Sequence, residues 1–219
     1  MIQTGVYFND IHSFYDLNLI LSSVEIPPAQ PKTNYVDVPG ADGSVDLTEA
    51  HGEVKYNDRN ITFTFTMNPS GDLSEAAWTE KKTEVSNRLN GRKFKIILDK
   101  DDGFYWSGRC TVDTYKSEKR VRQIVVVARV KPYKYKTSET VIKISLTETP
   151  KAVNIINSRM SVCPFIECTG DTTISFKTAT FAMNSGVHRF LDIEFKEGVN
   201  QLELSGTGTV TFRYQEGDL

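Results

Sequence analysis

Three histidines, His12, His51 and His188, are the first residues to consider for catalysis. A nucleophilic mechanism pairs a histidine with a serine or a cysteine, as in the hydrolases that carry a Gly-x-Ser-x-Gly elbow. The sequence contains no such elbow, and no histidine has a serine or cysteine partner at a recognisable spacing. The residue types for this chemistry are present, but their pattern predicts no enzyme.

Acidic residues suggest two further kinds of site. Asp99, Asp101 and Asp102 precede Gly103, but a calcium loop needs acidic residues at alternate positions and a closing glutamate. The observed spacing instead predicts a hairpin turn. A pair of carboxylates that catalyses glycoside hydrolysis is not excluded by the sequence. The same residues are also explained as ordinary solvent-exposed carboxylates. The candidates are Glu53, Asp58, Glu194 and Glu203.

The three cysteines predict neither a metal centre nor a disulfide. Zinc sites use close pairs such as Cys-x-x-Cys, and the sequence has none. If the chain is extended between them, Cys163 and Cys168 lie roughly 16 Å apart on opposite sides of a strand, too far for a bridge. Cys110 is expected to be a small core residue. We therefore expect no metal and no cofactor.

Length and charge exclude several classes of protein. The 219 residues can form one large or two modest domains, and the formal net charge is only −2. The charge is evenly spread, which predicts no strong attraction to nucleic acid or membrane. One basic group remains, either a solvated hairpin end or a partner contact: Lys116, Lys119, Arg120 and Arg122. Residues 1–8 lack the pattern of a secretory signal, so we expect synthesis in a cytoplasm.

The positions of apolar residues predict a mainly β protein with one helix. Residues 61–67 alternate apolar residues with threonine, which is typical of a strand that buries one face. A helix is expected within about residues 73–90, because Asp72 or Ser74 can cap its start and Asn90-Gly91 can end it. Its apolar stripe consists of Trp78, Val85 and Leu89.

Other segments complete the first half of the chain. The remaining expected strands are 7–15, 17–26, 94–99, 104–112 and 122–130, with the third and fourth forming a hairpin. Residues 124–128 are all apolar, so we expect this run to be buried on both faces or to lie in an interface. Residues 27–34 are rich in proline and cannot join the middle of a sheet.

The pattern weakens over residues 134–140, where we place a domain boundary. The two expected domains are therefore 1–132 and 133–219. The second contains short apolar segments separated by regular turns, which predict a β-sandwich. Its expected strands are 140–146, 162–168, 172–178, 190–195, 201–205 and 207–214.

A tight turn precedes the alternating strand and adds family information. It contains Pro39, Gly40, Asp42, Gly43 and Ser44. The proline fixes φ and the glycines permit positive φ, which together favour a surface turn. With the alternating strand following at this spacing, the segment resembles the N-terminal region of the distal tail proteins of long, non-contractile-tailed bacteriophages.

Two later motifs resemble the same family. Pro132-Tyr133 is similar to the family's domain boundary. The closing hairpin of the C-terminal domain is also similar, through Gly198, Asn200, Gly206, Arg213 and Tyr214.

The resemblance implies an N-terminal domain that is a β-sandwich or barrel-like, with one helix and a hairpin, followed by a galectin-like β-sandwich. It implies a structural virion protein at the tail tip that forms a six-membered ring, single or stacked. Its partners would be other copies of itself, the tail-tube protein, the tail-associated receptor-binding protein and the tape-measure protein. DNA would pass through the lumen without sequence-specific binding.

A carbohydrate-binding β-sandwich is the alternative function. A sugar site usually stacks an aromatic ring against the sugar, and the candidate residues are Tyr105, Trp106 and Tyr214. The domain 133–219 contains no tryptophan, which disfavours this alternative. A small hydrolase ranks behind both.

Overall fold

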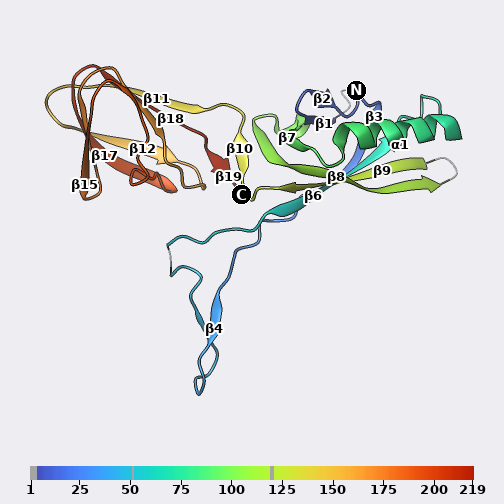
Figure 1. Ribbon diagram of the computed structural model, residues 1–219, viewed down its shortest axis with the longest axis horizontal. Helices are drawn as coiled ribbons and strands as arrows, with labels where there is room; N and C mark the ends of the chain where they lie inside the picture. The colour runs from blue at the N-terminus through green and yellow to red at the C-terminus, as the bar shows by residue number, and fades with distance from the viewer. Residues whose placement is uncertain (1–3, 51, 119–120) are drawn as a thin grey trace. The chain divides into compact units, whose positions relative to one another are not determined.

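The computed structural model describes residues 4–50, 52–118 and 121–219, so His51, Lys119 and Arg120 lie outside the described residues. The chain divides into two compact units, Met1–Lys134 and Tyr135–Leu219. This division falls close to the expected boundary at Pro132-Tyr133. Strands dominate both units and the described chain has one α-helix, so the expected mainly β class is confirmed (Figure 1).

The N-terminal unit is built on one antiparallel sheet. Along its path the strand order is β2-β1-β7-β8-β9-β6-β3. The path is open at β2 and β3, so the described strands do not close into a barrel, and the barrel-like option of the expected fold is corrected. The strands are β1 (Val6–Phe8), β2 (Ile11–His12), β3 (Leu19–Glu25), β6 (Arg59–Met67), β7 (Lys93–Leu98), β8 (Phe104–Glu118) and β9 (Val121–Val130).

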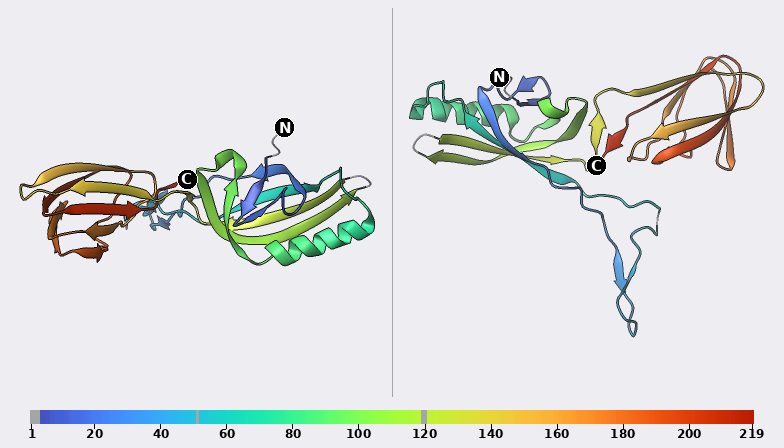
Figure 2. Two further views of the ribbon diagram at one scale, coloured as in Figure 1. Left: turned by 90° about the horizontal axis from the view of Figure 1, so that it is seen from above. Right: turned by 180° about the vertical axis from the view of Figure 1, so that it is seen from behind.

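The single helix α1 (Glu75–Leu89) covers one face of this sheet (Figure 2). Ser74 is its N-cap: the hydroxyl oxygen accepts a hydrogen bond from the Ala77 N–H at 3.2 Å. The expected stripe is buried, and Trp78 contacts Tyr115 of β8 edge to face, with ring centroids 6.1 Å apart. The expected helix is therefore confirmed, including its cap and its core face.

Strands β6 and β9 show that the sheet has one core face. Phe63 and Phe65 of β6 are fully buried, whereas the threonines beside them are half-buried on the opposite face. In β9, Val126 enters the core, while Val125 and Val127 point to the opposite face, where Val125 is 8% exposed and Val127 is half-buried. No second layer of the described chain covers that face. The apolar run of β9 was expected to be buried on both faces or to lie in an interface. In the described chain another layer covers only its core face.

The opening segment differs from the expected strand over residues 7–15. It forms a β1–β2 hairpin instead, because Asn9 adopts a left-handed conformation with φ of 54°. The hairpin between β7 and β8 agrees with the expectation, and a short 3-10 turn, η1 (Asp99–Asp101), joins its strands.

Residues 30–50 and 52–57 form a projecting segment, called the arm below (Figures 1 and 2). At its base the Lys32 N–H donates to the Lys55 carbonyl oxygen at 2.7 Å, and the Asn57 N–H donates to the Gln30 carbonyl oxygen at 2.9 Å. Its far end is a hairpin of β4 (Tyr35–Asp37) and β5 (Ser44–Asp46), and every residue of both strands is exposed. As expected from its prolines, the segment 27–34 joins no central strand.

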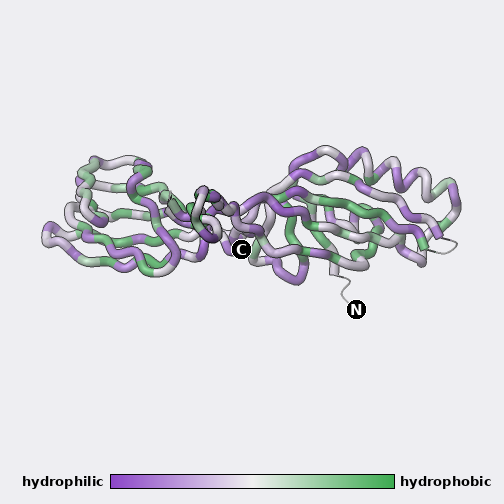
Figure 3. Tube along the Cα trace, turned by 90° about the horizontal axis from the view of Figure 1, so that it is seen from below, coloured by the Kyte–Doolittle hydropathy of each residue, from purple (hydrophilic) through white to green (hydrophobic). Residues whose placement is uncertain are grey.

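The C-terminal unit is a β-sandwich of two four-stranded sheets. Their orders are β11-β18-β13-β16 and β12-β17-β14-β15. Figure 3 shows apolar and polar residues alternating along strands of both units. The strands of the two sheets are β11 (Thr140–Ser145), β12 (Lys151–Asn157), β13 (Phe165–Cys168), β14 (Thr172–Phe176), β15 (Ala179–Met183), β16 (Gly186–His188), β17 (Gly198–Gly206) and β18 (Thr209–Tyr214), while β10 (Lys134–Lys136) and β19 (Gly217–Asp218) pair with each other outside these sheets.

The described strands differ from the expected ones in several places. Residues 190–195 form only an isolated bridge through Phe195, although Ile193 and Phe195 are buried. Strands β12, β15 and β16 were not expected, and in β12 a polar residue, Asn157, occupies an inward position. Asn157 is buried and its side chain donates hydrogen bonds to the carbonyls of Met160 and Phe195. Whether the sandwich is galectin-like stays a prediction of the resemblance.

Replacing the helix cap tests the local argument for α1. We expect Ser74→Ala to lower the free energy of unfolding by about 1 kcal/mol, because the first helical turn loses its side-chain acceptor. Urea unfolding followed by circular dichroism measures the change. Ser70→Ala, in the preceding turn, is the matched control. Equal effects of the two substitutions would contradict the capping role.

Candidate interaction surface

His12 has an acidic neighbour in space, but it serves the fold. Its Nε2 lies 3.2 Å from Asp99 Oδ2, and its Nδ1 accepts hydrogen bonds from the Phe14 and Tyr15 N–H groups. The residue is 1% exposed. Since both ring nitrogens are engaged and substrate cannot reach them, this pair does not form a catalytic base. Sequence reasoning missed the pair because the two residues are far apart in the chain.

The acidic candidates are separated by the fold. Asp99 accepts a hydrogen bond from the Gly5 N–H at 2.6 Å, whereas Asp101 forms an ion pair with Lys134 at 2.8 Å. Asp58 lies between Arg129 and Lys131, and Glu53 lies 3.9 Å from Lys55. Within the described part of the chain, no group of three or more histidine, cysteine or acidic side chains could hold a metal ion.

The three cysteines are free thiols; Cys110 and Cys168 are buried and Cys163 is partly buried. Burial raises the pKa of the Cys110 thiol to about 12. Burial also raises the pKa of Cys163 and of Cys168. The thiolate is the reactive form of cysteine, so these environments oppose nucleophilic chemistry.

Two of the aromatic candidates for sugar binding are buried. Trp106 is 3% exposed and Tyr214 is 2% exposed. The Tyr214 hydroxyl donates to the Ile156 carbonyl at 3.0 Å, and burial raises its pKa to about 12, with Glu216 adding to the shift. Tyr105 lies under Lys95, whose Nζ is 4.2 Å from the ring centroid. Trp106 and Tyr214 therefore cannot stack on a sugar, which corrects that part of the expected alternative.

The turn that resembles the phage family lies at the tip of the arm. Gly40 and Gly43 have φ of 83° and 72°, and a Cβ on either would contact nothing within 4 Å. Pro39, Asp42 and Ser44 beside them are exposed. The motif therefore gives the hairpin its shape and does not form a pocket.

The other motif residues stabilise their own units. Tyr133 contacts Tyr56 at the base of the arm, with ring centroids 6.0 Å apart, and Pro132 beside it is half-buried. In the C-terminal unit, Asn200 is 7% exposed and its side chain donates to the turn carbonyls of Lys196 and Gly198.

Gly206 and Arg213 have different surroundings. A Cβ on Gly206 would lie 2.1 Å from the Asp171 carbonyl oxygen, so only glycine fits there. Arg213 is exposed and lies 3.4 Å from Glu167. The fold does not bring these motif residues together with the arm motif into one site.

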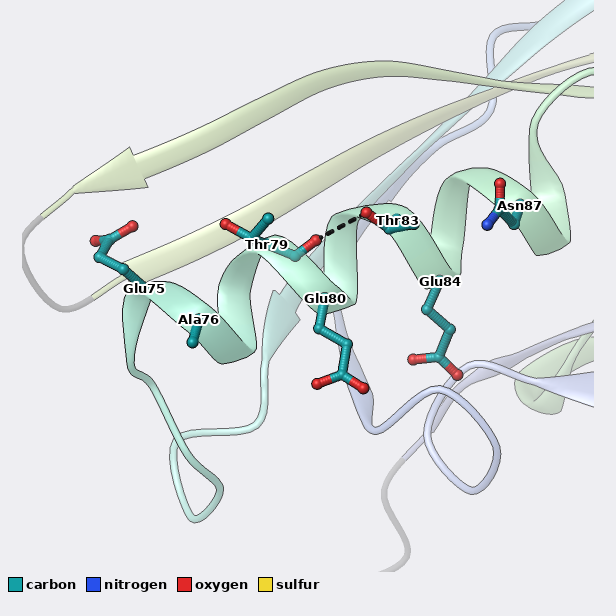
Figure 4. A pocket seen from close by; sticks show the side chains of 7 residues that line it. All are labelled: Glu75, Ala76, Thr79, Glu80, Thr83, Glu84 and Asn87. Atoms are coloured by element: carbon teal, nitrogen blue, oxygen red, sulfur yellow. Dashed lines mark hydrogen bonds between the residues drawn. The ribbon is translucent and has the colours of Figure 1, made fainter.

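The outer face of α1 is a shallow surface made by one helix (Figure 4). Its residues are Glu75, Ala76, Thr79, Glu80, Thr83, Glu84 and Asn87. Glu75 forms an ion pair with Arg122 of β9 at 2.7 Å, and Glu84 forms one with Lys81 at 2.5 Å. Glu75 and Glu84 are therefore already paired within the chain.

Three basic residues on adjacent strands lie side by side on the open face of the N-terminal sheet. Lys93 of β7 lies directly opposite Arg109 of β8, and Arg109 lies directly opposite Arg129 of β9. All three are exposed on the face that α1 does not cover. With Lys131 they line a hollow of about 400 Å³. We call Lys93, Arg109, Arg129 and Lys131 the basic row.

This row has an electrostatic cost. Like charges directly opposite on neighbouring strands destabilise a sheet, because adjacent strands are only about 4.8 Å apart. Asp58 gives partial compensation, with its carboxylate 3.4 Å from Arg129 Nε and 3.6 Å from Lys131 Nζ. Arg109 also donates to the Gly91 carbonyl oxygen. A row kept despite this cost suggests a binding role.

Sequence reasoning missed the basic row because its members are spread over nearly forty residues of chain. Pairing of β7, β8 and β9 is what brings them together. The basic group that the sequence did indicate is only partly described. Within it, Arg122 is paired with Glu75, and its guanidinium carbon lies 5.7 Å from the centre of the Trp78 ring.

The fold belongs to the class found in the adsorption hubs of phages that infect Gram-positive bacteria. The similar structure is the crystal structure of the SPP1 Dit (gp 19.1) protein, described as a paradigm of that hub adsorption apparatus. The TM-score is 0.73, with 99% of each chain covered at 12% sequence identity. The resemblance to distal tail proteins is thus confirmed at the level of fold.

No protein-family model matches the sequence, and no curated protein matches it. No described helix is long and apolar enough to cross a membrane.

Removing one charge from the basic row should stabilise the isolated chain. We expect Lys93→Thr to raise the free energy of unfolding by about 0.2–1 kcal/mol, because it relieves repulsion with Arg109 and places a β-branched residue in a strand. Urea unfolding at low and high salt measures the effect, and screening by salt should reduce the gain. Lys151→Thr on β12 is the control. A loss of stability would contradict the repulsion.

Thiol reactivity tests the cysteine environments. At about pH 8 we expect native Cys110 and Cys168 to react with a disulfide reagent far more slowly than a free thiol, because burial raises their pKa and limits access. Titration after unfolding in guanidinium should detect all three cysteines. Fast reaction of all three in the native protein would contradict the buried positions.

Proposed function

We propose that this protein is a structural component of a phage tail tip, a distal tail protein whose copies form a ring of six. The single observation that carries the proposal is the Dit-like fold along 99% of the chain. The motifs at the tip of the arm, at the unit boundary and in the closing hairpin give separate support. These motifs are local similarities of sequence. The likeness in fold is a separate observation, because the two chains share only 12% sequence identity.

The N-terminal sheet has the features that such an assembly needs. Its path ends at β2 on one side and at β3 on the other, so it has two different open edges. Unpaired backbone groups at sheet edges are suited to contacts with another chain. A head-to-tail contact between two different surfaces produces a ring when its rotation closes. The two edges of this sheet, β2 and β3, differ in amino-acid sequence, so they fit that type of contact.

The proposed partners follow from the hub role. One side of the ring would bind the tail-tube protein, and the other would bind the tail-associated protein that carries the receptor-binding machinery. The tape-measure protein and DNA would pass through the lumen, and the protein would assemble in the bacterial host cytoplasm. The role is architectural and not enzymatic, and the buried or paired state of His12, Asp99 and Cys110 supports this view.

Mass measurement tests the ring directly. We expect light scattering after size exclusion to give a species near six times 24.7 kDa, and negative-stain images to show rings. If the chain is a monomer alone, adding the tail-tube protein should produce the ring, because partners can supply the missing contact. A chain that stays monomeric at high concentration, alone and with its tail partners, would contradict the proposal.

A further inference from the structure

The hairpin at the end of the arm has two different faces. Val36 lies directly opposite Val45 in the β4–β5 pairing, and Val38 and Leu47 extend the same apolar face. These side chains are 39–48% exposed. Asp37 and Asp46 lie on the other face, where Tyr35 pairs with Asp46 and Asp37 pairs with Ser44. An isolated two-stranded hairpin is only marginally stable in water, so this one gains from a partner.

The hairpin is also strongly acidic. Residues 35–49 contain Asp37, Asp42, Asp46 and Glu49 but no lysine or arginine. The Ser44 hydroxyl donates to Asp37 at 2.6 Å, and the Thr48 N–H donates to Asp46 at 2.9 Å. Hydrogen bonds from the side chain and backbone of Thr48 hold the pKa of Asp46 below its usual value. The Asp46 carboxylate is therefore charged near neutral pH.

The basic row has the opposite charge and a compatible spacing. Diagonal neighbours in a hairpin are about 7–8 Å apart, which applies to Asp37 and Asp46. Lys93 and Arg129 are separated by two strand spacings, roughly 10 Å, and their long side chains can close the difference. Asp58 already shows that a carboxylate fits between basic residues on this surface.

We propose that the basic row of one copy binds the acidic hairpin of a second copy. This inference rests on the proposed ring and names one of its contacts. The arm can reach a neighbour, because the extended chain from Lys32 to Gly40 spans roughly 27 Å. The contact joins two different surfaces, as a ring requires. It also explains why the sheet keeps like charges side by side.

Nucleic acid fits the row less well than the hairpin. A phosphate backbone is usually bound by a longer track of basic residues. Here the row is short, and the carboxylate of Asp58 lies beside it, where it would repel phosphate. The Asp58 carboxylate is compatible with the hairpin, because the hairpin has only a few carboxylates and they lie at separate positions.

A charge exchange between the two surfaces tests the proposal. The first variant, Arg109→Glu with Arg129→Glu, reverses the row. The second, Asp37→Lys with Asp46→Lys, reverses the hairpin. A third carries all four substitutions. The control, Lys143→Glu with Lys151→Glu, makes the same charge change as the first variant on exposed strand positions of the C-terminal unit. Circular dichroism establishes that each variant is folded.

Association of the full-length chains is measured by analytical ultracentrifugation and light scattering at equal concentrations. We expect each two-residue reversal to weaken self-association at least about 100-fold, because each places like charges in contact. The four-residue variant should regain association, as should an equal mixture of the first two variants. In that mixture, each hairpin can meet a row of opposite charge when the variants alternate. The control should associate like the unchanged protein.

Four results would overturn the contact. If both reversed variants assemble like the unchanged protein, the hairpin does not bind the row, while the ring itself stands. If the exchange does not restore association, the two surfaces contact other partners. If a duplex oligonucleotide binds the unchanged protein but not the reversed row, the occupant is nucleic acid. If neither the unchanged protein nor the mixture associates, with or without the tail-tube protein, both the contact and the proposed ring are excluded.

Discussion

The N-terminal unit depends on one constraint: its large antiparallel sheet has a single core face. Helix α1 supplies Trp78, Val85 and Leu89 to the core on that face, where Phe8 of β1 also packs against Phe63 of β6, with ring centroids 5.8 Å apart. Period-two alternation then places threonines and charged residues on the opposite face. Because no second layer of the described chain covers that face, it is available for contacts. The sheet also has open edges at β2 and β3.

The surfaces left open are not arranged for the stability of a single chain. Basic residues lie directly opposite one another on β7, β8 and β9, and the hairpin of the arm exposes valines to solvent. Each arrangement costs folding free energy in an isolated molecule. Arrangements that destabilise an isolated chain are expected where a protein binds a partner, because binding offsets the cost in folding free energy. Both arrangements lie in the N-terminal unit, the unit to which we assign ring formation.

The C-terminal unit solves the burial problem differently. Two sheets face each other, so apolar residues of both are covered within the chain. Several of its buried polar groups donate to backbone carbonyls: the side-chain amides of Asn157 and Asn200, and the Tyr214 hydroxyl. These hydrogen bonds favour one arrangement of loops and strands. The unit has no comparable row of like charges across adjacent strands in the pairings described.

The sequence by itself determined the class of fold, the helix with its Ser74 cap, the strand over residues 61–67 and the hairpin after Leu98. These features depend on local signals, namely periodicity, capping and turn residues, which act over a few neighbouring positions. It also indicated the resemblance to distal tail proteins through short turn motifs. It did not indicate β12, β15 and β16, nor the turn at Asn9 within the expected first strand. Only the tertiary structure decided that Lys93, Arg109 and Arg129 form one row, that His12 is paired with Asp99, and that Trp106 and Tyr214 are buried. The physical reason is that strand pairing joins residues far apart in the chain, and no local pattern records which strands become neighbours.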